Sequence, residues 1–177
     1  METARRLSLL AATLTCGLTA GLLFGYACSV MPALSGSGDG VFVEVMQRIN
    51  VAILNGWFLV CFVGALVLGV LAVALQLPGQ RGPALVWAGL GLALYLASLA
   101  VTAVVNVPLN DALAAVPFGE PFGEPSGQPS GEPSVLAAAR VAFEQRWVVA
   151  NLARTVLATA SFACFAWSLA AGGPGQG

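Results

Sequence analysis

Apolar residues in this chain gather into four long runs, and the segments between them hold most of the polar residues. The runs cover residues 7–30, 51–75, 84–107 and 147–171. A helix needs roughly 20 predominantly apolar residues to cross a bilayer, and each run is long enough. The pattern predicts an all-α polytopic membrane protein, a four-transmembrane-helix bundle that forms one membrane domain.

The segments between the runs differ in character. Residues 41–50 are amphipathic and predict a helical lead-in to the second run, and residues 134–147 predict a helix that leads directly into the fourth run. Residues 117–134 repeat the tetrapeptide P-[FS]-G-[EQ], and proline and glycine at this density hold neither helix nor strand. We expect a low-complexity, disordered loop between helices 3 and 4. A partner-binding tract is the alternative.

The composition supports a protein surrounded by lipid. Hydrophobic residues make up 58% of the 177 residues and charged residues only 8%, whereas soluble domains average about 25% charged residues. We therefore expect the lipid bilayer as the main partner and no nucleic acid. The sequence indicates no oligomeric state.

The first run could also be read as a secretory signal, because Arg5 and Arg6 precede it. A signal core is about 7–15 residues long, and this run is longer. The sequence before Cys28 matches a lipoprotein site only weakly, because Gly25 stands where a branched residue is expected. We expect the run to be retained as a transmembrane helix.

Basic residues near the ends of the runs indicate the orientation. The two sides carry three arginines each, but the N-terminal pair usually dominates and the opposite side is net acidic. We expect a multi-pass protein of the cell membrane with both termini in the cytoplasm. One side holds Glu2, Arg5, Arg6 and Arg81; the other holds Asp39, Glu44, Arg48, Asp111, Glu120, Glu124, Glu132, Arg140, Glu144 and Arg146.

Tryptophan positions suggest where the membrane interfaces lie. Trp147 and Trp167 are 20 residues apart, which is roughly 30 Å along a helix and about one hydrocarbon thickness. They are expected to mark the two aromatic belts of the last helix, and Trp87 the inner belt of the third.

Polar side chains recur on single helix faces, at spacings of three, four and seven residues. Three of the four stripes are strongest toward the same, proposed outer, end of their helices. The stripes are Thr15, Thr19, Tyr26 and Ser29; Glu44, Arg48, Val51 and Asn55; Ser98, Thr102, Asn106 and Asn110; and Glu144, Trp147, Asn151, Arg154 and Ala158.

Pro108 interrupts the third stripe. Proline removes a backbone donor and disfavours helix at the residue before it. We expect the third helix to end at Pro108, with Asn110 holding the turn and Asn106 facing the polar residues of the fourth helix. A plain capped helix end is the alternative.

Arg154 is the one charged residue within the four runs. Placing an arginine at the centre of a membrane helix costs at least about 2.5 kcal/mol. Asn151 lies on the same face, and two polar residues on one stripe favour an inward polar site. Snorkelling of the arginine to the interface and hydrogen bonding between packed helices are the alternatives.

The chain lacks several residue types that catalytic sites use. It has no histidine, its four cysteines form no CxxC pair, and no carboxylate lies within a run. These absences argue against His-ligated metals or haem, against a histidine base and against a proton-coupled exporter built on a membrane carboxylate. We expect no metal and no cofactor.

Four motifs occur in an order and spacing that resemble the anthrone-oxygenase-like family of small four-helix membrane proteins, whose bacterial members are mostly uncharacterised. The resemblance covers nearly the whole chain except residues 117–134. The motifs are VMPAL (30–34), MQRINVAILNGWF (46–58), TAVVNVPLN (102–110) and RWVVANLART (146–155). Two positions depart from the family pattern: Gly56 stands where proline is common, and Leu152 where histidine is common.

The resemblance implies an oxidoreductase that acts without a cofactor on an anthrone- or hydroquinone-like aromatic. Arg154 with Asn151 or Asn106 would hold the developing oxyanion, and Asp111 or Glu144 would serve as base. The alternative is a non-catalytic membrane protein that binds a lipid or quinone-like ligand, or a subunit of a membrane complex. The ligand-binding candidates are Arg48, Asn50, Asn55, Asn106, Asn110 and Trp147.

Overall fold

The computed structural model describes residues 2–77, 82–117 and 132–172, and this part of the chain is helical apart from short turns. In the described residues, seven α-helices and two π-helical segments follow one another. They are α1 (Glu2–Gly25), η1 (Tyr26–Val30), α2 (Met31–Ser35), α3 (Asp39–Ala52), α4 (Gly56–Gln76), α5 (Pro83–Val101), η2 (Thr102–Asn106), α6 (Val107–Ala114) and α7 (Pro133–Ala171).

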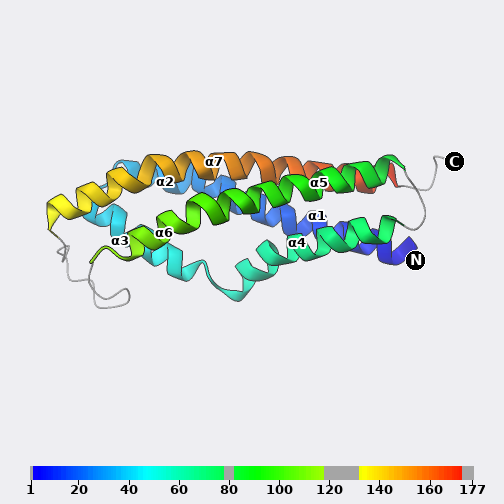
Figure 1. Cartoon of the computed structure of the whole chain (residues 1–177), viewed down its shortest axis with the longest axis horizontal. Coiled ribbons are helices and arrows are strands. Elements are labelled where there is room, and N and C mark those ends of the chain that lie inside the picture. The colour runs from blue at the N-terminus through cyan, green and yellow to red at the C-terminus, as the bar shows by residue number, and fades with distance from the viewer. Residues whose placement is uncertain (1, 78–81, 118–131, 173–177) are drawn as a thin grey trace.

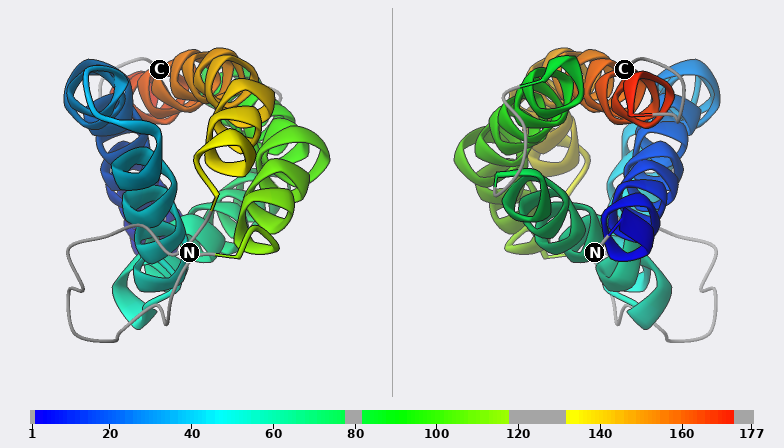
Figure 2. Two further views of the ribbon diagram at one scale, coloured as in Figure 1. Left: turned by 90° about the vertical axis from the view of Figure 1, so that its left-hand side faces the viewer. Right: turned by 90° about the vertical axis from the view of Figure 1, so that its right-hand side faces the viewer.

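Within the part of the chain that the structure describes, four helical units are long and apolar enough to cross a membrane, and they make the chain a multi-pass integral membrane protein. They are Glu2–Ser35, Gly56–Gln76, Pro83–Ala114 and Pro133–Ala171. The four units form a ring in which α1 packs on α4 and α7, and α5 packs on α7 and α4 (Figure 2). The expected four-helix bundle is confirmed.

Small residues let α5 and α7 approach closely. A Cβ atom on Gly91 would lie 3.2 Å from the carbonyl oxygen of Ser161, so no larger residue fits there without movement. The Ser161 hydroxyl in turn donates to the Gly91 carbonyl over 2.7 Å, and Ser168 donates to the Ala84 carbonyl over 2.7 Å. Small residues and interhelical hydrogen bonds of this kind hold helices together in lipid.

At the end away from the termini, α2, α3, α6 and the first turns of α7 extend the bundle and form a hydrophobic core of their own (Figure 1). Arg140 fastens this end: its guanidinium contacts Asp39 over 3.1 Å and Glu144 over 2.7 Å. It also donates to the carbonyls of Ser37 over 2.7 Å and Ser35 over 2.8 Å. The turn between α2 and α3 is thereby tied to α7.

The third span does not end at Pro108, so that expectation is wrong. The helix continues to Ala114 through the π-helical segment Thr102–Asn106, whose last turn is closed by the Val107 amide donating to the Thr102 carbonyl. A π turn widens the helix and accommodates a residue that cannot donate. The first span repeats the device, because Pro32 stands two residues after η1.

The prediction of the second polar stripe is also wrong at Asn55. The amphipathic segment before the second span is helical, as expected, but α3 ends at Ala52 and α4 begins at Gly56. Asn55 therefore lies on neither helix. Its side chain caps α4 by accepting from the Phe58 amide over 3.1 Å.

Most of the P-[FS]-G-[EQ] repeat, residues 118–131, lies outside the described residues. The lead-in to the fourth span is helical as predicted, because α7 begins at Pro133 and continues without interruption into the membrane.

Candidate functional site

Arg154 lies inside the bundle, on the face of α7 that packs against α1 and α5. Its residue surface is only 9% exposed. Its Nε donates to Oδ1 of Asn151 over 3.1 Å, and Nδ2 of Asn151 donates to the Leu23 carbonyl of α1 over 3.1 Å. The contact with α1 fixes which way the amide points, so its oxygen faces the guanidinium.

The Trp147 ring packs against the guanidinium of Arg154. The guanidinium carbon of Arg154 lies 5.1 Å from the centre of the Trp147 ring, within the range of a cation–π interaction. Nε1 of Trp147 donates to Oδ1 of Asn110 over 2.9 Å, and the Tyr26 ring lies 5.7 Å from the indole. Three different spans therefore position the Trp147 ring.

Trp147 is 3% exposed, so it is a core residue, and the expectation that it marks an aromatic belt is wrong. Trp167 differs, because it is 61% exposed and lies 6.2 Å from Trp87, ring centre to ring centre. These two residues mark one level at the opposite end of the bundle.

Asn106 lies on η2, which packs against α7, and it is 1% exposed. Two contacts bracket it: the Ser98 hydroxyl donates to the Arg154 carbonyl over 3.2 Å, and Asn110 accepts from Trp147. Because η2 and α7 are antiparallel, Asn106 lies near the level of Asn151. Neither amide atom of Asn106 has a hydrogen-bond partner among the described residues. We call Asn106, Asn151 and Arg154 the polar cluster.

Helix α3 brings a fourth polar residue to this level. Its contacts with α7 pair residues 39 with 140 and 42 with 143, so the two helices are parallel and in register. Extending that register places Asn50 at about the level of Asn151 along the bundle. Nδ2 of Asn50 is buried and has no partner among the described residues. Arg48 also has a buried Nε without such a partner, but its Nη2 pairs with Glu44 over 2.6 Å.

The structure does not bring the proposed bases to Arg154. Asp111 is exposed on α6, and Glu144 is engaged by Arg140 at 2.7 Å. Glu144 also precedes Arg154 by ten residues, roughly 15 Å along the helix. No ion pair among the described residues includes Arg154, so the cluster carries an uncompensated positive charge.

Sequence reasoning missed other contributions to this end of the bundle. The Leu23 carbonyl orients Asn151, and the side chain of Gln47 donates to the carbonyls of Leu113 and Val116 over 2.8 and 3.0 Å. A backbone carbonyl carries no residue-specific signal. Gln47 belongs to the MQ-x-IN motif, so its motif position was the available clue. In residues 2–77, 82–117 and 132–172, no group of three or more His, Cys, Asp or Glu side chains could hold a metal ion.

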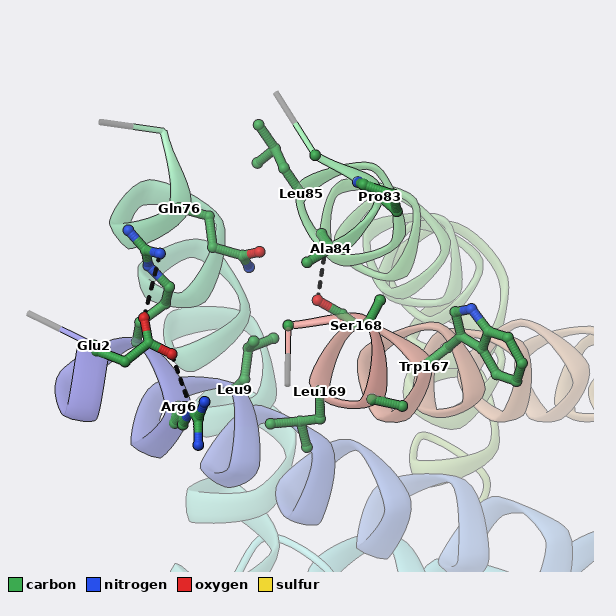
Figure 3. Close-up of a pocket in the computed structure, with 15 residues that line it drawn as sticks. Glu2, Arg6, Leu9, Gln76, Pro83, Ala84, Leu85, Trp167, Ser168 and Leu169 are labelled. Carbon is green, nitrogen blue, oxygen red and sulfur yellow. Dashed lines mark hydrogen bonds and ion pairs between the residues drawn. The ribbon is translucent and has the colours of Figure 1, made fainter. Parts of the chain in front are cut away.

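A separate cavity of about 590 Å³ opens at the other end of the bundle, where α1 begins and α7 ends (Figure 3). Its lining includes Glu2, Arg5, Gln76 and Trp167. Trp167 is 20 residues from Trp147 on α7, or roughly 30 Å along the helix, so this cavity is not part of the polar cluster.

Comparisons with known proteins agree with the motif pattern. The profile of the family described as anthrone oxygenase matches residues 57–164, a range that contains the whole polar cluster. No curated protein and no solved structure matches the chain. Since the profile covers more than half of the chain, this four-span membrane protein belongs to the anthrone oxygenase family.

Proposed function

We propose that the protein is an oxygenase that oxidises an anthrone- or hydroquinone-like aromatic without a cofactor. One observation carries the proposal: Arg154 is a buried cation that is oriented by Asn151 and has no carboxylate partner among the described residues. A buried charge is costly unless it is paired. An anionic oxygen on a bound aromatic would supply the missing pair.

The chemistry requires stabilisation of an oxyanion and little else. An anthrone loses a proton from its CH2 group to give an enolate, and the enolate passes an electron to O2. The carbon–oxygen bond then forms, and loss of water leaves a quinone, so CH2 and O2 become C=O and H2O. For a hydroquinone, two electrons and two protons pass to O2 and give a quinone and H2O2.

The residues of the cluster suit that chemistry. Arg154 would hold the enolate oxygen, because charge stabilisation in a water-poor site is worth more than in water. The amide of Asn106, which has no partner among the described residues, would contact a second oxygen of the substrate, and the indole of Trp147 offers an aromatic face. Asn50 would extend the polar lining from α3.

The proton would leave without a dedicated carboxylate, because Asp111 is exposed and Glu144 is paired with Arg140. A guanidinium beside the enolate oxygen stabilises the deprotonated substrate, so it lowers the substrate pKa and water can accept the proton. This assignment replaces the expectation of Asp111 or Glu144 as base.

The direct test is oxygen uptake by the purified protein with an anthrone or a hydroquinone. Wild type is expected to exceed Arg154→Ala by about 100-fold or more, the usual effect of removing one oxyanion donor. Arg146→Ala is the matched control, because Arg146 is exposed on the same helix. Equal rates for wild type and Arg154→Ala would remove the enzyme proposal.

A second candidate function is non-catalytic binding of a quinone-like molecule at the same residues. The positions of Asp111 and Glu144 favour it, since a binding protein needs no base. It predicts that a quinone quenches tryptophan fluorescence in wild type more strongly than in Arg154→Ala, while neither consumes oxygen. Quenching that is equal in the two proteins would contradict this candidate.

We also propose that the protein lies in the cell membrane with both termini in the cytoplasm. The start of α1 and the end of α7 line one cavity, so they lie at one end of the bundle, and Arg5 and Arg6 at that end support a cytoplasmic side. C-terminal fusions to a fluorescent protein and to alkaline phosphatase test on which side of the membrane the C-terminus lies. Fluorescence without phosphatase activity is expected, and phosphatase activity without fluorescence would overturn the proposed orientation.

A further inference from the structure

The cavity at the end of the bundle, which we call the terminal pocket, is built by all four spans. Glu2, Arg5, Arg6 and Leu9 come from α1, Gln76 from α4, residues 83–85 from α5 and residues 167–171 from α7. Figure 3 shows the side chains of Gln76 and Leu9 directed toward the space between the helices. Its volume of about 590 Å³ is that of a small-molecule site.

One side of the terminal pocket is cationic. Arg5 donates from Nε to the Leu75 carbonyl over 3.3 Å, and its Nη1 lies 3.5 Å from a Glu2 oxygen. Arg6 approaches Glu2 through Nε at 2.8 Å. Two guanidinium groups thus share one carboxylate, whose side chain is 57% exposed. Such exposed pairs are weak, so the arginines retain donors and net positive charge for an anion.

Apolar side chains also line the pocket, among them Leu85, Trp167 and Leu169. Trp167 is 61% exposed and packs edge-to-face with Trp87. Exposed tryptophans of a membrane helix sit where the hydrocarbon meets the headgroups. The pocket therefore opens at headgroup level, and both arginines and apolar side chains line it.

We propose that the terminal pocket binds an anionic phospholipid, with the phosphate against Arg5 and Arg6 and the upper acyl chain along Trp167 and Leu169. Arginine suits phosphate because its fork of donors contacts two oxygens at once. The amino end of α5 adds the positive end of a helix dipole, since Pro83 follows the N-cap Gly82. The proposal is independent of the proposed oxygenase, because it concerns different residues at the other end of the bundle.

The test is a native mass spectrometry titration of the full chain in detergent, with phosphatidylglycerol and phosphatidylcholine of identical acyl chains. Wild type is expected to prefer phosphatidylglycerol by about tenfold, and Arg6→Gln to reduce that preference by about fivefold, the usual effect of one arginine near an anionic lipid. Arg6 suits the test because its only described hydrogen bond is to Glu2, so the variant is expected to fold.

Glu2→Gln gives a prediction of opposite sign. Removing the shared carboxylate frees both arginines, so the preference for phosphatidylglycerol should rise by about fivefold. Arg146→Gln removes an exposed arginine elsewhere and is expected to change nothing.

Three results would overturn the proposal. They are equal binding of the two lipids by wild type, an equal loss in Arg146→Gln and Arg6→Gln, and displacement of the lipid by millimolar inorganic phosphate. The last result would assign the pocket to a free phosphate compound. If Glu2→Gln weakened the preference, the carboxylate would be a ligand contact and the cationic side would be wrongly assigned.

Discussion

Helix α7 carries three arginines in different surroundings, so the same substitution at each of them tests the role of Arg154. Arg140 makes two ion pairs and donates to backbone carbonyls of another segment. Arg154 is buried but has no acidic partner among the described residues. Arg146 is exposed. Methionine replaces each of them with an unbranched apolar side chain of comparable length.

The expected losses differ because the partners differ. Arg140→Met leaves two carboxylates unpaired. Breaking a fully buried ion pair costs about 3–5 kcal/mol, and because the Arg140 side chain is 14% exposed, we expect the free energy of unfolding to fall by about 2–4 kcal/mol. Arg146→Met should change stability by no more than about 0.5 kcal/mol.

Arg154→Met involves opposing effects of similar size. It removes a membrane arginine that costs at least about 2.5 kcal/mol. It also loses a charged hydrogen bond to Asn151, worth about 1.5–3 kcal/mol, and a cation–π contact with Trp147, worth about 0.5–2 kcal/mol. The losses sum to about 2–5 kcal/mol against a gain of at least about 2.5 kcal/mol, so we expect a net loss of about 1 kcal/mol, together with loss of oxygen uptake or ligand binding.

The assay is unfolding in mixed micelles of increasing dodecyl sulfate content, followed by helical circular dichroism. The expected order of destabilisation is Arg140→Met first, with Arg154→Met and Arg146→Met both small. A loss for Arg154→Met as large as that for Arg140→Met would refute the reasoning. Arg154 would then hold helices together as a structural residue, and the polar cluster would not be a binding site.

Three further predictions use the same unfolding assay. Gly91→Ala should lower the free energy of unfolding by about 1–3 kcal/mol, because the new Cβ would lie 3.2 Å from a backbone oxygen of α7. Gly89→Ala is the control, because a Cβ there has nothing within 4 Å and should not change stability. Equal effects of the two substitutions would contradict the close contact between α5 and α7. Trp147→Phe should cost about 1 kcal/mol by leaving Asn110 without its donor, and Trp147→Phe with Asn110→Leu should recover part of that loss; additive losses would contradict the hydrogen bond. Pro108→Ala should change the free energy of unfolding by no more than about 1 kcal/mol, because the π turn already accommodates the missing donor. It should nevertheless weaken quinone binding, because it alters the turn that positions Asn106. Unchanged binding would show that the π-helical segment does not contribute to the site.

Much of the fold could be predicted because membrane insertion depends on local composition. Four runs of sufficient length predict four spans whatever their neighbours, and the structure confirms them. The i, i+3 spacing of Asn151 and Arg154 likewise places them on one helix face before any packing is known, and the hydrogen bond between them confirms it. Local breaks were harder to predict, since a proline inside a helix permits either an end or a widened turn, and Pro108 takes the widened turn.

Only the tertiary structure decided which groups meet. In a membrane helix the lipid-facing and protein-facing sides are both apolar, so the pattern along the chain does not say which face is buried. Trp147 is therefore enclosed instead of facing the interface, and Asn55 caps a helix instead of extending a stripe. The register of α3 against α7 brings Asn50 to about the level of Asn151. The sequence by itself determined the spans and placed Trp147, Asn151 and Arg154 on one face of the last helix, whereas packing between distant segments determined that this face is buried, that the Leu23 carbonyl orients Asn151 and that Asn110 holds the Trp147 ring.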